Sequence, residues 1–73
     1  MINKYQELAN AIIEKAAEDY RKALRHDDEG AQYSIEKFFR SSYFSILTSI
    51  DPEYLIDKLN SEEKARKQAV DKS

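Results

Sequence analysis

The core of this chain has to form around residues 35–56, which read IEKFFRSSYFSILTSIDPEYLI. This stretch holds all three phenylalanines of the protein and two of its five tyrosines, set among isoleucine and leucine. Elsewhere the chain is rich in charged side chains, which make up 36% of all residues. Because burial of large apolar side chains drives folding, the hydrophobic core is expected in this segment. The same segment contains no recognisable catalytic motif.

Length and composition predict one small all-α domain. A chain of 73 residues buries only about 60% of the surface of its unfolded form, so its core is marginal by itself. No cysteine is present to form a disulfide or a thiolate metal site, so helix pairing or self-association as a homodimer has to supply further stability. One glycine and one proline are too few for the turns of a β-protein. We expect a small bundle of three to four helices.

Charge and hydropathy predict a soluble, cytoplasmic protein without a membrane partner. The 12 basic and 14 acidic side chains give a net charge of −2, which offers no overall attraction to nucleic acid or to anionic lipid. The first residues lead directly into polar, periodic sequence without the apolar segment of a signal peptide. No window approaches the roughly 18 apolar residues that a bilayer-spanning helix needs.

A long N-terminal helix is predicted from the spacing of apolar side chains between residues 5 and 24. They recur at intervals of three and four residues over about five turns, which is the pattern of an amphipathic helix. The positions are Tyr5, Leu8, Ala9, Ile12, Ile13, Ala16, Ala17, Tyr20, Ala23 and Leu24. Asn3 is the expected N-cap, and Gln6 stands where its capping-box partner belongs.

A second, aromatic-rich helix is predicted to return antiparallel to the first as a helical hairpin. Residues 27–30 interrupt the apolar pattern and contain the chain's only glycine. Asp27 or Asp28 is suited to cap the helix that follows, which we expect to begin near Ala31. A connection this short places the two helices side by side.

Serine, threonine and proline divide the C-terminal half of the chain. Serine and threonine are weak helix formers that prefer to cap, so we expect a break near Ser41 and Ser42 and a short capped helix over residues 43–48. Asp51 and Pro52 then have the character of an N-cap and of the first residue of a last helix.

The domain is expected to occupy residues 1–60, followed by a charged helical extension or frayed tail over residues 61–73. Phe44 lies off the helical stripe of its neighbours, so we expect it to face a second subunit or a target rather than the core. The expected core consists of Leu8, Ile12, Ala16, Tyr20, Leu24, Ile35, Phe38, Phe39, Tyr43, Ile46, Leu47, Ile50, Leu55 and Leu59.

Two segments carry a family resemblance. They are Ala11-Ile12, Ala16, Asp19-Tyr20-Arg21 and Ala23-Leu24, and then Phe38-Phe39-Arg40-Ser41, Tyr43-Phe44, Leu47-Thr48, Ile50-Asp51 and Tyr54-Leu55-Ile56. Over residues 9–59 the chain thereby resembles short helical proteins encoded by phages and prophages of low-GC Gram-positive bacteria, with the pattern FFRS-x-WF-x-x-LT-x-x-D-G-E-x-L-I. Tyr43 replaces the group's Trp and Pro52 its Gly. The resemblance implies a phage-borne protein in the cytoplasm of a host cell and supplies no mechanism.

The candidate residues for contacts with a partner are Arg21, Arg25, Arg40, Tyr43 and Phe44. Aromatic side chains and arginine dominate interface hot spots, but aromatic side chains at helical spacing are more often packed in the core. Arg40 suits a phosphate or carboxylate of a partner, or else an internal ion pair with Glu36. Arg21 and Arg25 belong to a basic group that suits DNA phosphates, or that is an ordinary solvated face.

Catalysis is not expected. His26 and the acidic residues after it lack any metal-ligand spacing and are explained by helix capping. The chain has no nucleophile–base pairing and no Gly-rich phosphate loop, and small helices hardly enclose a substrate pocket. We therefore expect no enzymatic activity, no cofactor and no metal.

Two functions remain as hypotheses from the sequence. The first is a small phage or prophage accessory protein that acts by protein–protein contact and modulates or inhibits a host factor. The alternative is a small dimeric DNA-binding regulator that uses the basic end of the first helix or the tail. A purely structural hairpin that assembles with itself is the third reading.

Overall fold

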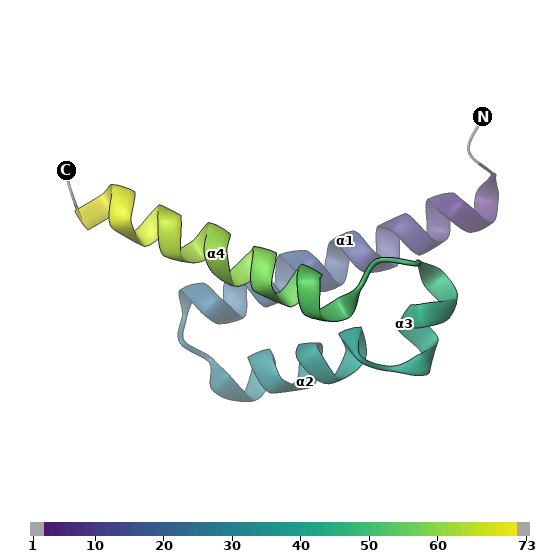
Figure 1. Ribbon diagram of the computed structural model, residues 1–73, viewed down its shortest axis with the longest axis horizontal. Helices are drawn as coiled ribbons and strands as arrows, with labels where there is room; N and C mark the ends of the chain where they lie inside the picture. The colour runs from purple at the N-terminus through teal and green to yellow at the C-terminus, as the bar shows by residue number, and fades with distance from the viewer. Residues whose placement is uncertain (1–2, 72–73) are drawn as a thin grey trace.

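Within residues 3–71, the part that the computed structural model describes, the chain forms four helices and no strand. The helices are α1 (Lys4–Arg25), α2 (Glu29–Phe39), α3 (Ser42–Leu47) and α4 (Pro52–Asp71). Figure 1 shows α2 running back below α1, while α4 crosses α1 and ends far from the start of α1. α1 packs against each of the other three helices. The predicted all-α bundle, with its long first helix paired in a hairpin, is confirmed.

The start of α1 is closed by the predicted capping box. Oδ1 of Asn3 accepts a hydrogen bond of 2.8 Å from the N–H of Gln6, and Oε1 of Gln6 accepts one of 3.4 Å from the N–H of Asn3. The two side chains thus satisfy backbone N–H groups that have no partner within the helix.

The turn between α1 and α2 is made by two aspartates. Asp27 has a φ of 53°, in the left-handed region that aspartate tolerates better than most residues. Its N–H donates to the carbonyl of Leu24 at 3.3 Å, and the N–H of Asp28 donates to the carbonyl of Ala23 at 2.9 Å. These bonds end α1 in a Schellman-type turn. The side chain of Asp28 then caps α2 by accepting the N–H of Ala31 at 3.1 Å, and the only glycine lies in the first turn of α2.

Side-chain caps also begin α3 and α4. Oγ of Ser41 accepts the N–H of Phe44 at 3.2 Å, so the predicted break and its serine cap are confirmed. Oδ1 of Asp51 accepts the N–H of Glu53 at 3.0 Å, and α4 begins at Pro52 as predicted. Between them the chain is extended and carries α4 back across α1 (Figure 1).

α4 is 20 residues long and continues without a break to Asp71. Of the two alternatives for the end of the chain, the helical extension is therefore what the structure has as far as residue 71, and residues 72–73 lie outside the described part. The helix remains packed at least to Glu63, whose side chain is buried. Arg66 forms a bidentate ion pair with that carboxylate, at 3.1 and 3.3 Å.

The core lies between α1, α2 and α4, with α3 closing one end. Its largest fully buried side chains are Tyr20, Phe39, Phe44 and Leu59. The rings of Phe39 and Phe44 meet edge to face with centroids 5.4 Å apart, and those of Tyr20 and Phe39 do so at 5.8 Å. Edge-to-face contact is a favourable arrangement for aromatic pairs.

Several core predictions are wrong. Four side chains expected inside are largely exposed: Leu8 (61%), Tyr43 (53%), Ile46 (80%) and Ile50 (42%). Phe44, expected to face outward, is 1% exposed. The errors in α3 share one cause, because α2 ends at Phe39 and α3 restarts from the cap at Ser41. The helical phase counted through Phe39 therefore does not carry into α3, which turns Phe44 inward.

Leu8 is exposed for a different reason. α1 has 22 residues, whereas its antiparallel partner α2 has 11. The first turns of α1 accordingly extend past the end of α2, where only α3 lies beside them (Figure 1). The molecule measures 44 × 28 × 17 Å, a flat shape with much surface for its volume.

A candidate protein-contact surface on α1 and α3

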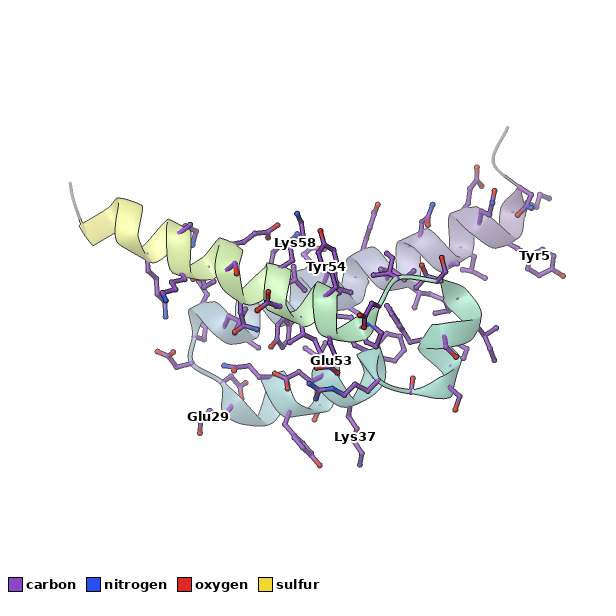
Figure 2. The ribbon with its side chains drawn as sticks, viewed as in Figure 1. Tyr5, Glu29, Lys37, Glu53, Tyr54 and Lys58 are labelled. Carbon is purple, nitrogen blue, oxygen red and sulfur yellow. The ribbon has the colours of Figure 1, made fainter. Side chains whose placement is uncertain are left out.

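Exposed apolar side chains gather where the outer turns of α1 meet α3. Tyr5 and Leu8 come from α1, and Tyr43 and Ile46 come from α3. We call these four residues the apolar face. Figure 2 shows the side chain of Tyr5 projecting from the outer end of α1, where the figure also places α3.

A shallow groove lies between Tyr5 and Ile46, one residue from each part of the apolar face, whereas Leu8 and Tyr43 do not line it. Its lining consists of Asn3, Tyr5, Gln6 and Ala9 of α1 and of Ile46 and Leu47 of α3, and its volume is about 290 Å³. The polar members Asn3 and Gln6 are occupied with each other in the capping box. The groove therefore offers mainly hydrocarbon and a tyrosine ring to whatever covers it.

Tyr43 connects the apolar face to the core. Its ring lies 6.1 Å from that of Phe38, which in turn meets the buried ring of Phe44 at 5.8 Å. One side of Tyr43 is thus held by the aromatic cluster while the other remains open. A side chain fixed in this way loses little conformational entropy when a partner covers it.

No charged residue occurs between Ser41 and Ile50, in a chain whose residues are 36% charged. α3 and the segment after it therefore present hydroxyl groups and apolar side chains alone. The centres of protein interfaces are likewise depleted of charge and enriched in aromatic side chains. The composition of this surface matches that of an interface core.

The five residues predicted to contact a partner are not brought together by the structure. Tyr43 lies on the apolar face. Phe44 is a core residue and is not available at the surface, which corrects its assignment as a contact. Arg21, Arg25 and Arg40 lie outside the apolar face.

Arg40 forms internal ion pairs, as one of the two readings of the sequence had it. Its Nη2 donates to Oε1 of Glu53 at 2.9 Å and its Nε to Oε2 of the same carboxylate at 2.5 Å, while Nη1 reaches Oε1 of Glu36 at 3.5 Å. In Figure 2, Glu53 extends from the start of α4 into the space beside α2. The hydrogen bonds from Arg40 lower the pKa of Glu53. Arg40 thus joins the end of α2 to the start of α4.

The basic groups of α1 and α4 are interleaved with carboxylates. Arg21 Nε lies 3.2 Å from Oε2 of Glu62, and Lys67 Nζ lies 3.7 Å from Oδ1 of Asp27. The hydrogen bonds from Arg66 lower the pKa of Glu63, and the charge of Arg25, which is exposed at the end of α1, adds to this effect. A surface on which cations are paired with acids is a weak attractor for nucleic-acid phosphates.

A second groove, of about 480 Å³, lies between α4 and the α1–α2 turn and is larger than the one on the apolar face. Its lining includes Asp27 and Lys67, which pair with each other, and Gln32 and Asn60, whose amides donate to groups of the protein itself. Within the described part of the chain, no three His, Asp or Glu residues gather as a set able to hold a metal ion. The lining also includes Asp57, Ser61 and Lys64, so this groove is mainly polar, in contrast to the one on the apolar face.

Sequence reasoning missed Tyr5, Leu8 and Ile46 as surface residues. The amphipathic pattern of α1 shows which stripe is apolar, but not how much of that stripe a neighbouring helix covers. The available signal was length, because a stripe running from Tyr5 to Leu24 is longer than an 11-residue partner can cover.

The fold and this surface define a small helical-bundle protein with an exposed apolar face. No protein-family model, curated protein or solved structure matches the chain. Across residues 3–71, no helix is both long enough and apolar enough to cross a membrane. The resemblance to phage-encoded proteins therefore stays a prediction.

Proposed function

We propose that this chain is a small non-enzymatic accessory protein of phage or prophage origin that acts by protein–protein contact through the apolar face. It works in the cytoplasm of the host cell, where it modulates or inhibits a host factor. The observation that carries the proposal is the exposure of Tyr5, Leu8, Tyr43 and Ile46 on the neighbouring helices α1 and α3, of which α3 lies in a segment without charge.

The distribution of exposed apolar side chains supports a contact function. The large hydrophobic residues with the most exposure are Tyr5, Leu8, Tyr33, Tyr43, Ile46, Ile50 and Tyr54. Four of these seven are the residues of the apolar face and a fifth, Ile50, follows α3 in the same uncharged segment, so the exposure is concentrated and not scattered. Single apolar residues on a surface are ordinary, but a contiguous patch is typical of an interaction site.

The hydrogen bonds among the polar side chains of the bundle indicate that these groups have a structural role and not a catalytic one. The phenol of Tyr20, the carboxylates of Glu36 and Glu53 and the guanidinium of Arg40 are hydrogen-bonded to one another. Groups held in this way stabilise the helix packing and are not positioned toward a substrate pocket. The alternative of a DNA-binding regulator has less support, because Arg21 and Lys67 are paired with carboxylates.

The proposal is tested by capture from a Gram-positive host lysate, with and without nuclease, using matched variants. Ile46→Asp places a charge on the apolar face. Tyr33→Asp places the same charge on α2, where Tyr33 stacks with Lys37, a residue that points away from the bundle in Figure 2. Both positions are largely exposed, so both variants should fold.

We expect one host protein to be recovered with wild type and with Tyr33→Asp, to survive nuclease, and to be lost with Ile46→Asp. The purified pair should then reconstitute the same dependence. If the host protein is no longer recovered after nuclease treatment, the DNA-binding alternative is favoured. If the Ile46→Asp variant still recovers it, the contact lies outside the apolar face. Phage genes flanking the coding sequence would support the origin.

A further inference from the structure

The outer turns of α1 carry an apolar seam that the bundle does not cover. Tyr5, Leu8 and Ile12 follow one another at intervals of three and four residues, so they share one side of the helix. This is the spacing by which two helices pair along a seam. Tyr5 and Leu8 are mostly exposed and Ile12 is partly so.

The chain buries little for the number of apolar side chains it has. Among residues 3–67, whose exposure the structure describes, the buried large hydrophobic residues are Tyr20, Leu24, Phe39, Phe44, Ile56 and Leu59, whereas seven others are mostly or partly exposed. With about 200 Å² for a fully exposed large side chain, the apolar face offers on the order of 500 Å². A standard interface covers about 800 Å² on each partner. The face therefore supplies more than half of what a stable contact needs.

The charge pattern of the apolar face is compatible with pairing to the same face of a second copy of the chain. In a two-fold symmetric interface the side chains on the axis meet their own equivalents, so a charge at the centre is opposed by a like charge, whereas residues away from the axis meet different residues of the second copy. The segment from Ser41 to Ile50 has no charge, and the first nine residues of α1 carry only Lys4 and Glu7, which have opposite signs. A strongly charged partner would find no complementary charge here.

We infer that the apolar face pairs with the apolar face of a second copy of this chain, in a symmetric dimer with the outer turns of the two α1 helices antiparallel. Leu8 is the middle residue of the seam, so it faces Leu8 of the second copy at the axis. Ile46 and Tyr43 flank that contact from α3. The inference rests on the proposed function to the extent that the apolar face is a protein contact. Because both contacts use this face, a host factor that binds it replaces the second copy.

Sedimentation equilibrium of the purified full chain tests the inference through Leu8. Leu8→Glu and Leu8→Lys introduce good helix formers at an exposed position of α1, so both variants should keep the helical circular dichroism of wild type. We expect wild type to be a dimer and each variant alone to dimerise at least about 30-fold more weakly, the loss expected at a hot spot. An equimolar mixture of the two variants should restore dimerisation, because opposite charges then meet at the axis. Tyr33→Asp should dimerise as wild type does.

The inference would be overturned if the wild-type chain stayed monomeric up to about 1 mM. Its free energy of dimerisation would then be weaker than roughly 4 kcal/mol. A dimer that tolerates both Leu8 variants, or one that the mixture does not restore, would also overturn the inference. These results leave the proposed function standing, because its test is capture of a different protein that depends on Ile46. Conversely, a dimer that captures no host protein supports the inference and counts against the proposed function.

Discussion

The hydroxyl of Tyr20 donates a hydrogen bond of 2.6 Å to Oε2 of Glu36, and this contact joins α1 to α2 inside the bundle. Nδ2 of Asn60, on α4, donates to the same phenolic oxygen at 2.9 Å. Tyr20 has no exposed surface, so its hydroxyl has to find partners within the protein. One side chain therefore ties three helices together.

Replacing Tyr20 by phenylalanine should lower the free energy of unfolding by about 1–3 kcal/mol, because the carboxylate of Glu36 and the amide of Asn60 each lose a partner. The ring and its packing against Phe39 are kept. Urea denaturation followed by circular dichroism measures the change. The matched control is Tyr54→Phe, at an exposed position on the side of α4 away from α2 (Figure 2), where a change within about 0.5 kcal/mol is expected. Equal effects of the two variants would contradict the role of the Tyr20 hydroxyl.

Stability should also fall in alkali because of Tyr20. Burial, together with the hydrogen bond to Glu36, raises the pKa of Tyr20 from 10.0 to about 12. Between these values the folded chain keeps a proton that the unfolded chain has released, so the free energy of unfolding decreases as the pH rises. The contribution is complete below pH 10.0 and is lost toward about 12. Thermal midpoints across this range measure it, and Tyr20→Phe should show a shallower decline than wild type; parallel declines would exclude Tyr20 as the cause.

The ion pair of Arg40 with Glu53 should make stability depend on acid pH. The guanidinium holds the pKa of Glu53 below its ordinary value of 4.5. A carboxylate with a lowered pKa in the folded state stabilises above its unfolded pKa, and this stabilisation is lost as the pH falls through the folded value. Arg40→Gln should therefore have a lower thermal midpoint than wild type at neutral pH.

The difference between Arg40→Gln and wild type should shrink as the pH drops below 4.5, and also with added salt. Lys15→Gln is the control, since Lys15 and Asp19 form an exposed i,i+4 pair at 3.2 Å on the surface of α1. A smaller effect is expected there. A difference at Arg40 that is the same at neutral and acid pH would mean that packing of the side chain, and not its charge, stabilises the bundle.

Features set by neighbouring residues were predictable from the sequence, and those that depend on distant residues were not. The Asn3–Gln6 capping box and the Ser41 cap need only residues three positions apart, and both occur as predicted. The orientation of α3 depends on the backbone angles at Arg40 and Ser41, and the spacing of apolar residues in the sequence does not reveal these angles. The Tyr20–Glu36 contact joins residues 16 positions apart and needs the hairpin to exist first. On the apolar face, Tyr43 was predicted both as a core residue and as a contact, whereas Ile46 was assigned to the core alone because the phase was carried through the break.

The changed register of α3 gives the sharpest test of the fold. Phe44→Ala should cost about 3–5 kcal/mol, the range for removing a buried phenylalanine, because Phe44 packs against Phe38 and Phe39 and is 1% exposed. A small domain has only about 5–15 kcal/mol of stability in total, so this loss removes a large fraction of it. Ile46→Ala, at a position that is 80% exposed, should change stability by about 0.5 kcal/mol or less.

Urea denaturation of both variants at low protein concentration measures the contrast, since dilution removes any contribution from self-association. A helix that ran without interruption from α2 would reverse the order, with Ile46 in the core and Phe44 outside. The larger loss at Phe44 would therefore establish that the chain restarts at Ser41. It would also show that Ile46, freed from the core by that restart, is available to a partner.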